Sequence, residues 1–108
     1  MSLKSEYDAA YFTLLRAHEE RDDLLRYREF LDAERDRLDA FSDATREEED
    51  TLPRRIRRAV GLTSKQLLEA VGRRRTVVLD ERRRVDDRIS AAEDFVRECE
   101  RDVDRLRA

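Results

Sequence analysis

Residues 68–106 read "LEAVGRRRTVVLDERRRVDDRISAAEDFVRECERDVDRL", and one spacing runs through the whole stretch. Steps of three and four residues alternate without a break from Leu68 to Leu106. The positions on this register are Leu68, Val71, Arg75, Val78, Arg82, Val85, Ile89, Ala92, Val96, Cys99, Val103 and Leu106. A 3.5-residue period is typical of a helix that packs lengthwise along another helix. The stretch therefore predicts a long helical arm over about residues 64–107.

The first half of the chain carries a second stripe with the same period. Its positions are Tyr7, Ala10, Leu14, Ala17, Arg21, Leu24, Arg28, Leu31, Arg35 and Leu38. Five further apolar residues widen this stripe, namely Tyr11, Leu15, Leu25, Phe30 and Phe41. A wide stripe on a helix can contact more than one neighbour. We therefore expect a first arm over about residues 5–49, with apolar side chains beyond those that a single facing helix needs.

The segment "LPRRIRRAVG", residues 52–61, lies between the two arms. Pro53 stands where helices commonly start and Gly61 where they commonly stop. Thr63 or Ser64 then offers a capping oxygen for the second arm. The sequence thus predicts one all-α domain over 1–108, a long antiparallel two-helix coiled-coil hairpin with a short helical tip at about residues 52–62.

Composition supports a fold with few elements. The 108 residues are 47% charged and 39% hydrophobic, with two glycines and one proline, which leaves little turn-forming material. Such a composition also occurs in disordered chains, but those lack regular apolar spacing. The N-terminal segment lacks the apolar centre of a signal peptide, and the chain lacks a membrane-length apolar run. With one cysteine, Cys99, the sequence favours a cytoplasmic protein without membrane contacts.

Arginines inside the two stripes give a register for the hairpin. If the turn is centred near residue 57, facing positions sum to about 114, as a short connection requires. The expected pairs are Arg21 with Glu93, Arg28 with Asp86, Arg75 with Asp39 and Arg82 with Asp32. The alternative is that the arginine stems cover the seam while their charged ends reach solvent.

The apolar residues outside the stripes point to a partner. A two-helix seam does not need Tyr11, Phe12, Leu15, Leu25, Phe30, Phe41 and Phe95. Some of them are therefore expected to contact a second copy or another protein, either as a homodimer or as a docking surface. The alternative is that they thicken the hairpin's own core.

The residues that carry chemistry are sparse. His18 is the one histidine, and it lies near the position expected to face Cys99. A cysteine and a histidine can form a nucleophile and its base, but no glycine loop or helix-end site is present to activate the thiol. The run "EEED" at residues 47–50 offers carboxylates to a divalent cation, although a solvated helix end is the commoner role of such a run. We expect no catalytic residues, no metal site, no cofactor and no enzymatic activity.

Charge is unevenly distributed along the chain. Residues 1–50 carry a net charge of −8, residues 51–75 carry +7 and residues 76–108 carry −2. The candidate partner-binding residues at the expected tip are Arg54, Arg55, Arg57, Arg58, Arg73 and Arg74. Mutual repulsion among these arginines would be relieved by an anionic partner. Alternatively, residues 47–50 fold back and neutralise them.

The predicted geometry resembles the coiled-coil hairpin of the Gre-type transcript-cleavage factors, which enter the secondary channel of RNA polymerase. This resemblance covers shape only. Those factors have acidic residues at the hairpin tip, whereas this tip reads "PRRIRR", and no second globular domain is expected in the 108 residues. The resemblance therefore does not imply cleavage activity.

Two functions follow from these observations. In the first, the protein is a regulatory interaction and assembly module whose arms dimerise or dock on a protein partner. Its basic tip is then either solvated or in contact with an acidic protein surface. In the second, it is a transcription-related regulator whose tip contacts nucleic-acid phosphates. Residues 51–75 contain no aromatic side chain that stacks on bases, so nucleic acid is the less favoured partner.

Overall fold

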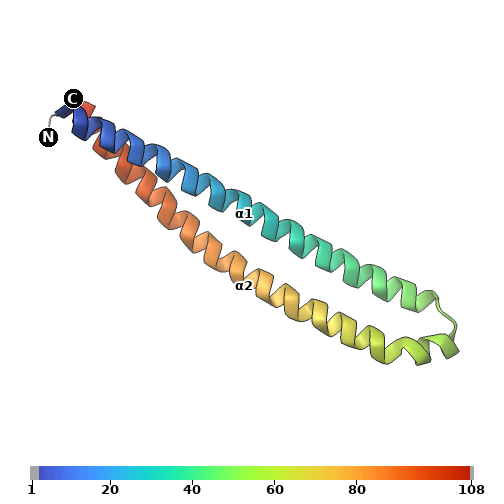
Figure 1. The fold of residues 1–108 in the computed structure, drawn as a ribbon. Helices are drawn as coiled ribbons and strands as arrows, with labels where there is room; N and C mark the ends of the chain where they lie inside the picture. The colour runs from blue at the N-terminus through green and yellow to red at the C-terminus, as the bar shows by residue number, and fades with distance from the viewer. Residues whose placement is uncertain (1–2, 108) are drawn as a thin grey trace. The chain divides into compact units, whose positions relative to one another are not determined.

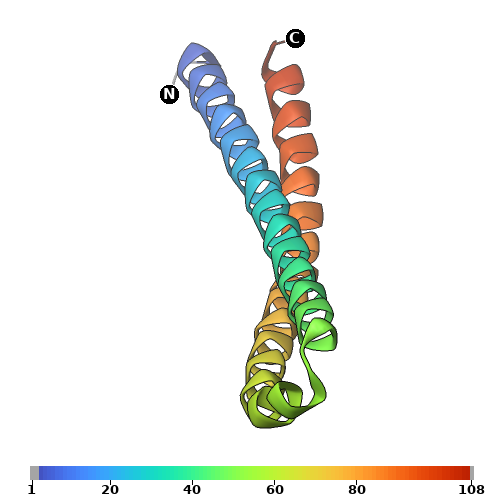
Figure 2. The same cartoon turned by 90° about the vertical axis from the view of Figure 1, so that its right-hand side faces the viewer.

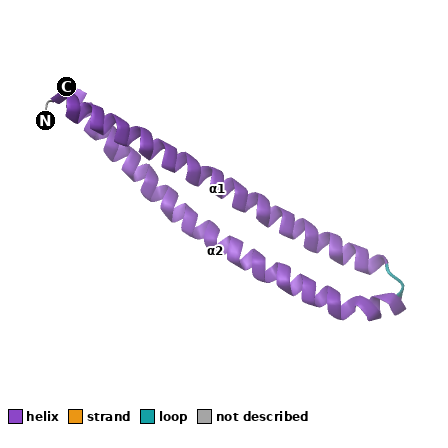
Figure 3. Cartoon of the chain, in the orientation of Figure 1, coloured by secondary structure: helices purple, strands orange, loops and turns teal. Residues whose placement is uncertain are grey.

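The computed structural model describes residues 3–107, so the first two residues and the last residue of the predicted domain lie outside the described chain. Helix α1 spans Leu3–Thr51 and helix α2 spans Arg54–Arg107 (Figure 1). Within residues 3–107, only Leu52 and Pro53 lie outside these helices, and no strand is present (Figure 3). The two helices pack against each other, which confirms the predicted all-α helical hairpin.

The sequence explains why α1 ends where it does. Proline disfavours helical geometry in the residue before it and has no backbone N–H to donate. Leu52 accordingly closes a tightened last turn by donating its backbone N–H to the Glu49 carbonyl at 3.1 Å. The carbonyl of Pro53 accepts the first bond of α2, from the backbone N–H of Arg57 at 2.9 Å. Pro53 thus separates the two helices and also caps the second one.

The predicted helix start at Thr63 or Ser64 is wrong. Helix α2 begins at Arg54 and runs through Gly61, which does not adopt the left-handed conformation that would end a helix. A glycine inside a helix costs only about 1 kcal/mol relative to alanine, which is too little to stop it. The predicted tip helix is therefore the beginning of α2, and Figure 2 shows α2 changing direction near this end.

The chain divides into two compact units, each built from both helices. We call residues 3–29 with 83–107 the terminal unit, and residues 30–82 the loop unit. Buried apolar side chains of the terminal unit are Ala17, Leu24, Val85, Ile89, Val96, Cys99 and Val103. The loop unit buries only Leu31 and Val78 to the same degree. The terminal unit therefore holds most of the apolar core.

Both predicted stripes face inward. Every stripe position in α1 and in α2 is buried or half-buried, including the arginines at positions 21, 28, 35, 75 and 82. Val85 is fully buried and Val78 nearly so, at 2% exposed. The 3.5-residue period thus identified the packed face of each helix along its length.

Three of the four predicted ion pairs form in the predicted register. Arg28 lies 3.5 Å from Asp86 in the terminal unit. In the loop unit, the Arg75 and Arg82 side chains bind Asp39 at 2.7 Å and Asp32 at 2.8 Å. The pairing of Arg21 with Glu93 is wrong, because the Arg21 guanidinium donates to Asp22 in its own helix at 3.1 and 3.2 Å.

Candidate interaction surfaces

Four arginines occupy the first two turns of α2 and form what we call the basic tip: Arg54, Arg55, Arg57 and Arg58. All four are exposed, and within residues 3–107 none of them makes an ion pair. Arg54, Arg55 and Arg58 line an open hollow of about 420 Å³. Three arginines of the basic tip therefore border one accessible space.

The positive charges of the basic tip lie at the end of the helix where positive charge is unfavourable. The N-terminus of a helix carries a partial positive charge, which favours acidic neighbours and disfavours basic ones. The first turn of α2 has no acidic residue, and the last turn of α1 has no basic residue. Residues 47–50 place carboxylates at the negative end of α1, where they are also disfavoured. The charges on both sides of the loop thus oppose local helix stability.

The alternative, in which residues 47–50 fold back and neutralise the tip, is not seen in the described chain. No ion pair within residues 3–107 joins these carboxylates to the tip arginines. The side-chain hydroxyl of Thr51 donates to the backbone carbonyl of Glu48 at 2.7 Å, which helps to finish α1. The acidic run and the basic tip therefore stand as separate charged segments.

The other two candidate tip residues lie elsewhere on α2. Arg73 is 19 residues beyond Arg54, roughly 28 Å along a helix at about 1.5 Å per residue. It is exposed, whereas Arg74 donates to Glu34 of α1, with 2.8 Å between Nε and Oε1. Arg74 is thus part of the contact between the helices. The structure brings together four of the six candidate arginines.

Glu34 is a residue that the sequence argument missed. Its side chain is only 16% exposed, and its Oε2 atom is buried without a hydrogen bond among the described residues. The predicted register pairs positions that sum to about 114, whereas Glu34 and Arg74 sum to 108. Glu34 and Arg74 flank the positions that face each other directly. A register rule that also paired flanking positions would have found them.

The apolar candidates of α1 remain largely outside the core. Tyr11 and Leu15 in the terminal unit are about 40% exposed, while Leu25 is half-buried. In the loop unit, Phe30 is 53% exposed and Phe41 is 46% exposed. Only Leu25 of these five follows the alternative in which surplus residues thicken the core.

Aromatic contacts hold some of these side chains in place. The Tyr11 ring stacks on Tyr7 and meets Phe12 edge-on, with centroid distances of 6.3 Å in both pairs. The Arg37 guanidinium lies 6.0 Å from the centroid of the Phe30 ring, within the range of a cation–π contact. Phe12 itself is 63% exposed. The start of α1 therefore presents an ordered aromatic cluster to solvent.

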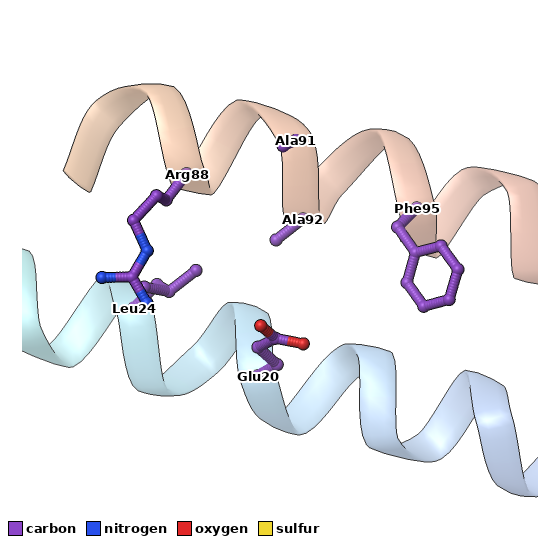
Figure 4. A pocket seen from close by; sticks show the side chains of 6 residues that line it. All are labelled: Glu20, Leu24, Arg88, Ala91, Ala92 and Phe95. Atoms are coloured by element: carbon purple, nitrogen blue, oxygen red, sulfur yellow. The ribbon is translucent and has the colours of Figure 1, made fainter. Parts of the chain in front are cut away.

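A hollow of about 290 Å³ lies between the helices of the terminal unit (Figure 4). Arg88 and Phe95 stand at its two ends on α2, with the small residues Ala91 and Ala92 between them. Glu20 and Leu24 line it from α1. The hollow thus combines an apolar floor, an aromatic ring, one acid and one base.

Cys99 is placed in the core. It packs with Ala17, Val96 and Leu14 and is 4% exposed. Burial raises the pKa of the Cys99 thiol, and the carboxylates of Asp102 and Glu98 raise it further. A thiol that stays protonated is a poor nucleophile, so this arrangement opposes the activation that a cysteine–histidine mechanism requires.

Residues 3–107 bring together no group of three or more histidine, cysteine or acidic side chains suited to a metal ion. Across the same residues, neither helix has a stretch long and apolar enough to cross a membrane.

Comparisons with protein-family models, with curated proteins and with solved structures find no match to this chain.

Proposed function

We propose that the chain is a non-enzymatic coiled-coil interaction and assembly module of the cytoplasm with a regulatory role. It self-associates or docks through the apolar residues of its arms and presents its basic tip to an acidic partner. One observation carries this proposal. The seam positions are buried or half-buried in the single chain, while Phe12, Phe30, Phe41 and Phe95 stay 44–63% exposed.

Exposed aromatic side chains are a feature of binding surfaces rather than of isolated helices. Aromatic residues and arginine are enriched where proteins meet, and they supply most of the binding energy there. This chain has both kinds, with aromatics on its arms and four arginines at its tip. The buried, protonated Cys99 supports a role without nucleophilic chemistry.

The position of the basic tip gives independent support. Arginines at a helix N-terminus work against the helix dipole, so helix stability does not account for them. Local features that cost stability are commonly found at functional sites. An acidic protein surface would satisfy both the arginines and the exposed backbone N–H groups of the first turn.

The arm contacts are tested by Phe30→Ser combined with Phe41→Ser. The unmodified chain is expected to sediment with the mass of two or more chains, and the double variant with the mass of one. Val77→Ser is the control, because Val77 is 55% exposed and is not assigned to the self-association surface. Unchanged association of the double variant would remove these two phenylalanines from the interface.

The tip is tested with a fluorescent polyglutamate peptide as the acidic probe. Replacement of all four tip arginines by glutamate is expected to abolish binding while circular dichroism shows unchanged helicity. Arg16→Glu with Arg101→Glu is the control, since both residues are exposed and lie in the terminal unit. Equal binding by the tip variant would show that the tip is a solvated turn.

A nucleic-acid-associated, transcription-related regulator is the second candidate. One observation favours it: Arg54, Arg55 and Arg58 line the same hollow, and guanidinium groups bind phosphate well. Duplex backbone is the expected target, since phosphate contacts need no aromatic rings. Labelled duplex and single-stranded DNA and RNA, titrated at several salt concentrations, separate the two candidates. Tip-dependent binding that falls steeply with salt would favour the second candidate.

A further inference from the structure

We propose that a second copy of this chain covers the hollow between Glu20, Arg88 and Phe95, forming a two-fold symmetric dimer whose interface includes this hollow. This inference rests on the proposed function and names one partner for one surface. The hollow has an apolar floor at Leu24, Ala91 and Ala92, and Phe95 beside it is 44% exposed. A bulky ring next to small residues offers both a projection and a recess.

The charged residues that line the hollow indicate which partner fits it. Glu20 on α1 and Arg88 on α2 line the same space, and neither forms an ion pair within residues 3–107. In a two-fold interface the same patch is used by both copies, so residue i meets residue j while j meets i. A patch with one unpaired acid and one unpaired base can satisfy that condition by itself. A uniformly charged partner would leave one of the two charges repelled.

The same charges select the orientation of the dimer. If the two-fold axis runs parallel to the helices of the terminal unit, α1 of one copy lies over α2 of the other. Glu20 then faces Arg88 of the second copy, and Arg88 faces Glu20 of the second copy. An axis perpendicular to the helices would stack α1 on α1 and bring the two Glu20 carboxylates together, which like-charge repulsion disfavours. The expected arrangement has four helices. Each α1 contacts its own α2 and the α2 of the second copy, and it runs antiparallel to both.

Phe95 supplies the apolar part of this contact. In the expected arrangement the Phe95 ring contacts α1 of the second copy, about two helical turns from the Arg88 contact. Burial of a phenylalanine that is exposed in the single chain favours association, and aromatic anchors beside small residues are common hot spots. The ion pairs at Glu20 and Arg88 would set the alignment of the two copies more than their affinity.

The experiment compares the unmodified full chain with three charge variants by sedimentation equilibrium. The unmodified chain is expected at the mass of two chains. Glu20→Arg and Arg88→Glu, each alone, place like charges opposite each other and are expected at the mass of one chain. The charge-exchanged variant with both substitutions restores the pairing and is expected at two chains.

A mixture of the two single variants gives the sharpest result. Glu20→Arg carries only positive charges on the patch and Arg88→Glu only negative ones, so the mixture is expected to form a one-to-one heterodimer. Native mass spectrometry distinguishes this heterodimer from either homodimer. Circular dichroism must show equal helicity for all variants.

Glu19→Arg and Arg101→Glu serve as matched controls. Both residues are exposed in the terminal unit and lie outside the hollow. They are expected to keep the mass of two chains, because they make the same charge changes away from the patch.

Three results would overturn the inference: an unmodified chain that sediments as one chain, single variants that associate as the unmodified chain does, or a mixture that stays monomeric. The first leaves the tip assay of the proposed function intact. The second leaves self-association intact but moves it to another surface. Failure of this inference is therefore distinguishable from failure of the proposed function.

Discussion

Arg82 of α2 lies against Asp32 of α1, with 2.8 Å between Nε and Oδ1. The two residues are 50 positions apart, so their contact fixes the alignment of the helices in the loop unit. Arg75 and Asp39 contact each other in the same register at 2.7 Å. The loop unit buries only two apolar residues, so its sparse core specifies the alignment weakly and such ion pairs help to set it.

A double-mutant cycle on Asp32→Ala and Arg82→Ala measures that contact. The pair is partly exposed, at 37% and 25%, so solvent screens it and we expect a coupling of about 0.5 kcal/mol. The control is the ion pair of Arg26 with Asp23 within α1, whose side chains are 75% and 72% exposed. We expect the coupling energy of this pair to be near zero. Equal coupling in both cycles would mean that Arg82 contributes no more than a surface charge.

Val85→Ala tests the packing of the terminal unit. Val85 is 0% exposed, so truncation removes buried methyl groups and leaves a cavity. We expect the free energy of unfolding to fall by about 2 kcal/mol in urea titrations. Val77→Ala, the same substitution at a site 55% exposed, is expected to change it little. Similar losses at both sites would contradict the assigned packed face.

The glycines of the loop unit offer a stabilising change. A methyl group added at Gly72 would meet no atom within 4 Å, and the same holds at Gly61. Neither residue has a left-handed backbone, so alanine fits both. Gly72→Ala is therefore expected to raise the free energy of unfolding by about 0.5–1 kcal/mol, because alanine restricts the unfolded chain and favours helix. Thermal unfolding followed by circular dichroism measures the effect, and Ala70→Gly should give the opposite sign.

Cys99 predicts a specific dependence of stability on pH. Its pKa in the folded chain is raised above the ordinary value of 9.0, chiefly by burial. The thiol in the unfolded chain therefore ionises first as pH rises, and the stabilising contribution, complete below pH 9.0, is lost as pH rises through the folded pKa. Urea titrations over this range should show a decline in the unmodified chain that is smaller in Cys99→Ala. Parallel pH profiles for the two proteins would contradict the prediction.

The sequence predicted the helical hairpin and its packed faces because the 3.5-residue period is a repeated signal. Twelve positions from Leu68 to Leu106 follow it, and a single exception would have little weight. Helix boundaries depend on one or two residues instead. The stop expected at Gly61 failed because the cost of one glycine is small compared with the continuation of a long helix.

Side-chain pairing was predictable only in part. Arg28, Arg75 and Arg82 reach acids across the seam, but Arg21 binds Asp22, its neighbour in sequence. A long flexible arginine can reach several carboxylates of similar energy, and sequence alone does not rank them. The hollow beside Phe95 was missed for a related reason. It is formed by small residues at Ala91 and Ala92, which leave no strong signal in a sequence.

Sedimentation equilibrium on the unmodified chain, over a range of micromolar concentrations, decides whether a second copy covers the hollow beside Phe95. The proposal predicts a mass of two chains that shifts to one chain when Glu20 is replaced by arginine, with helicity unchanged. A mass of one chain at every concentration would contradict it.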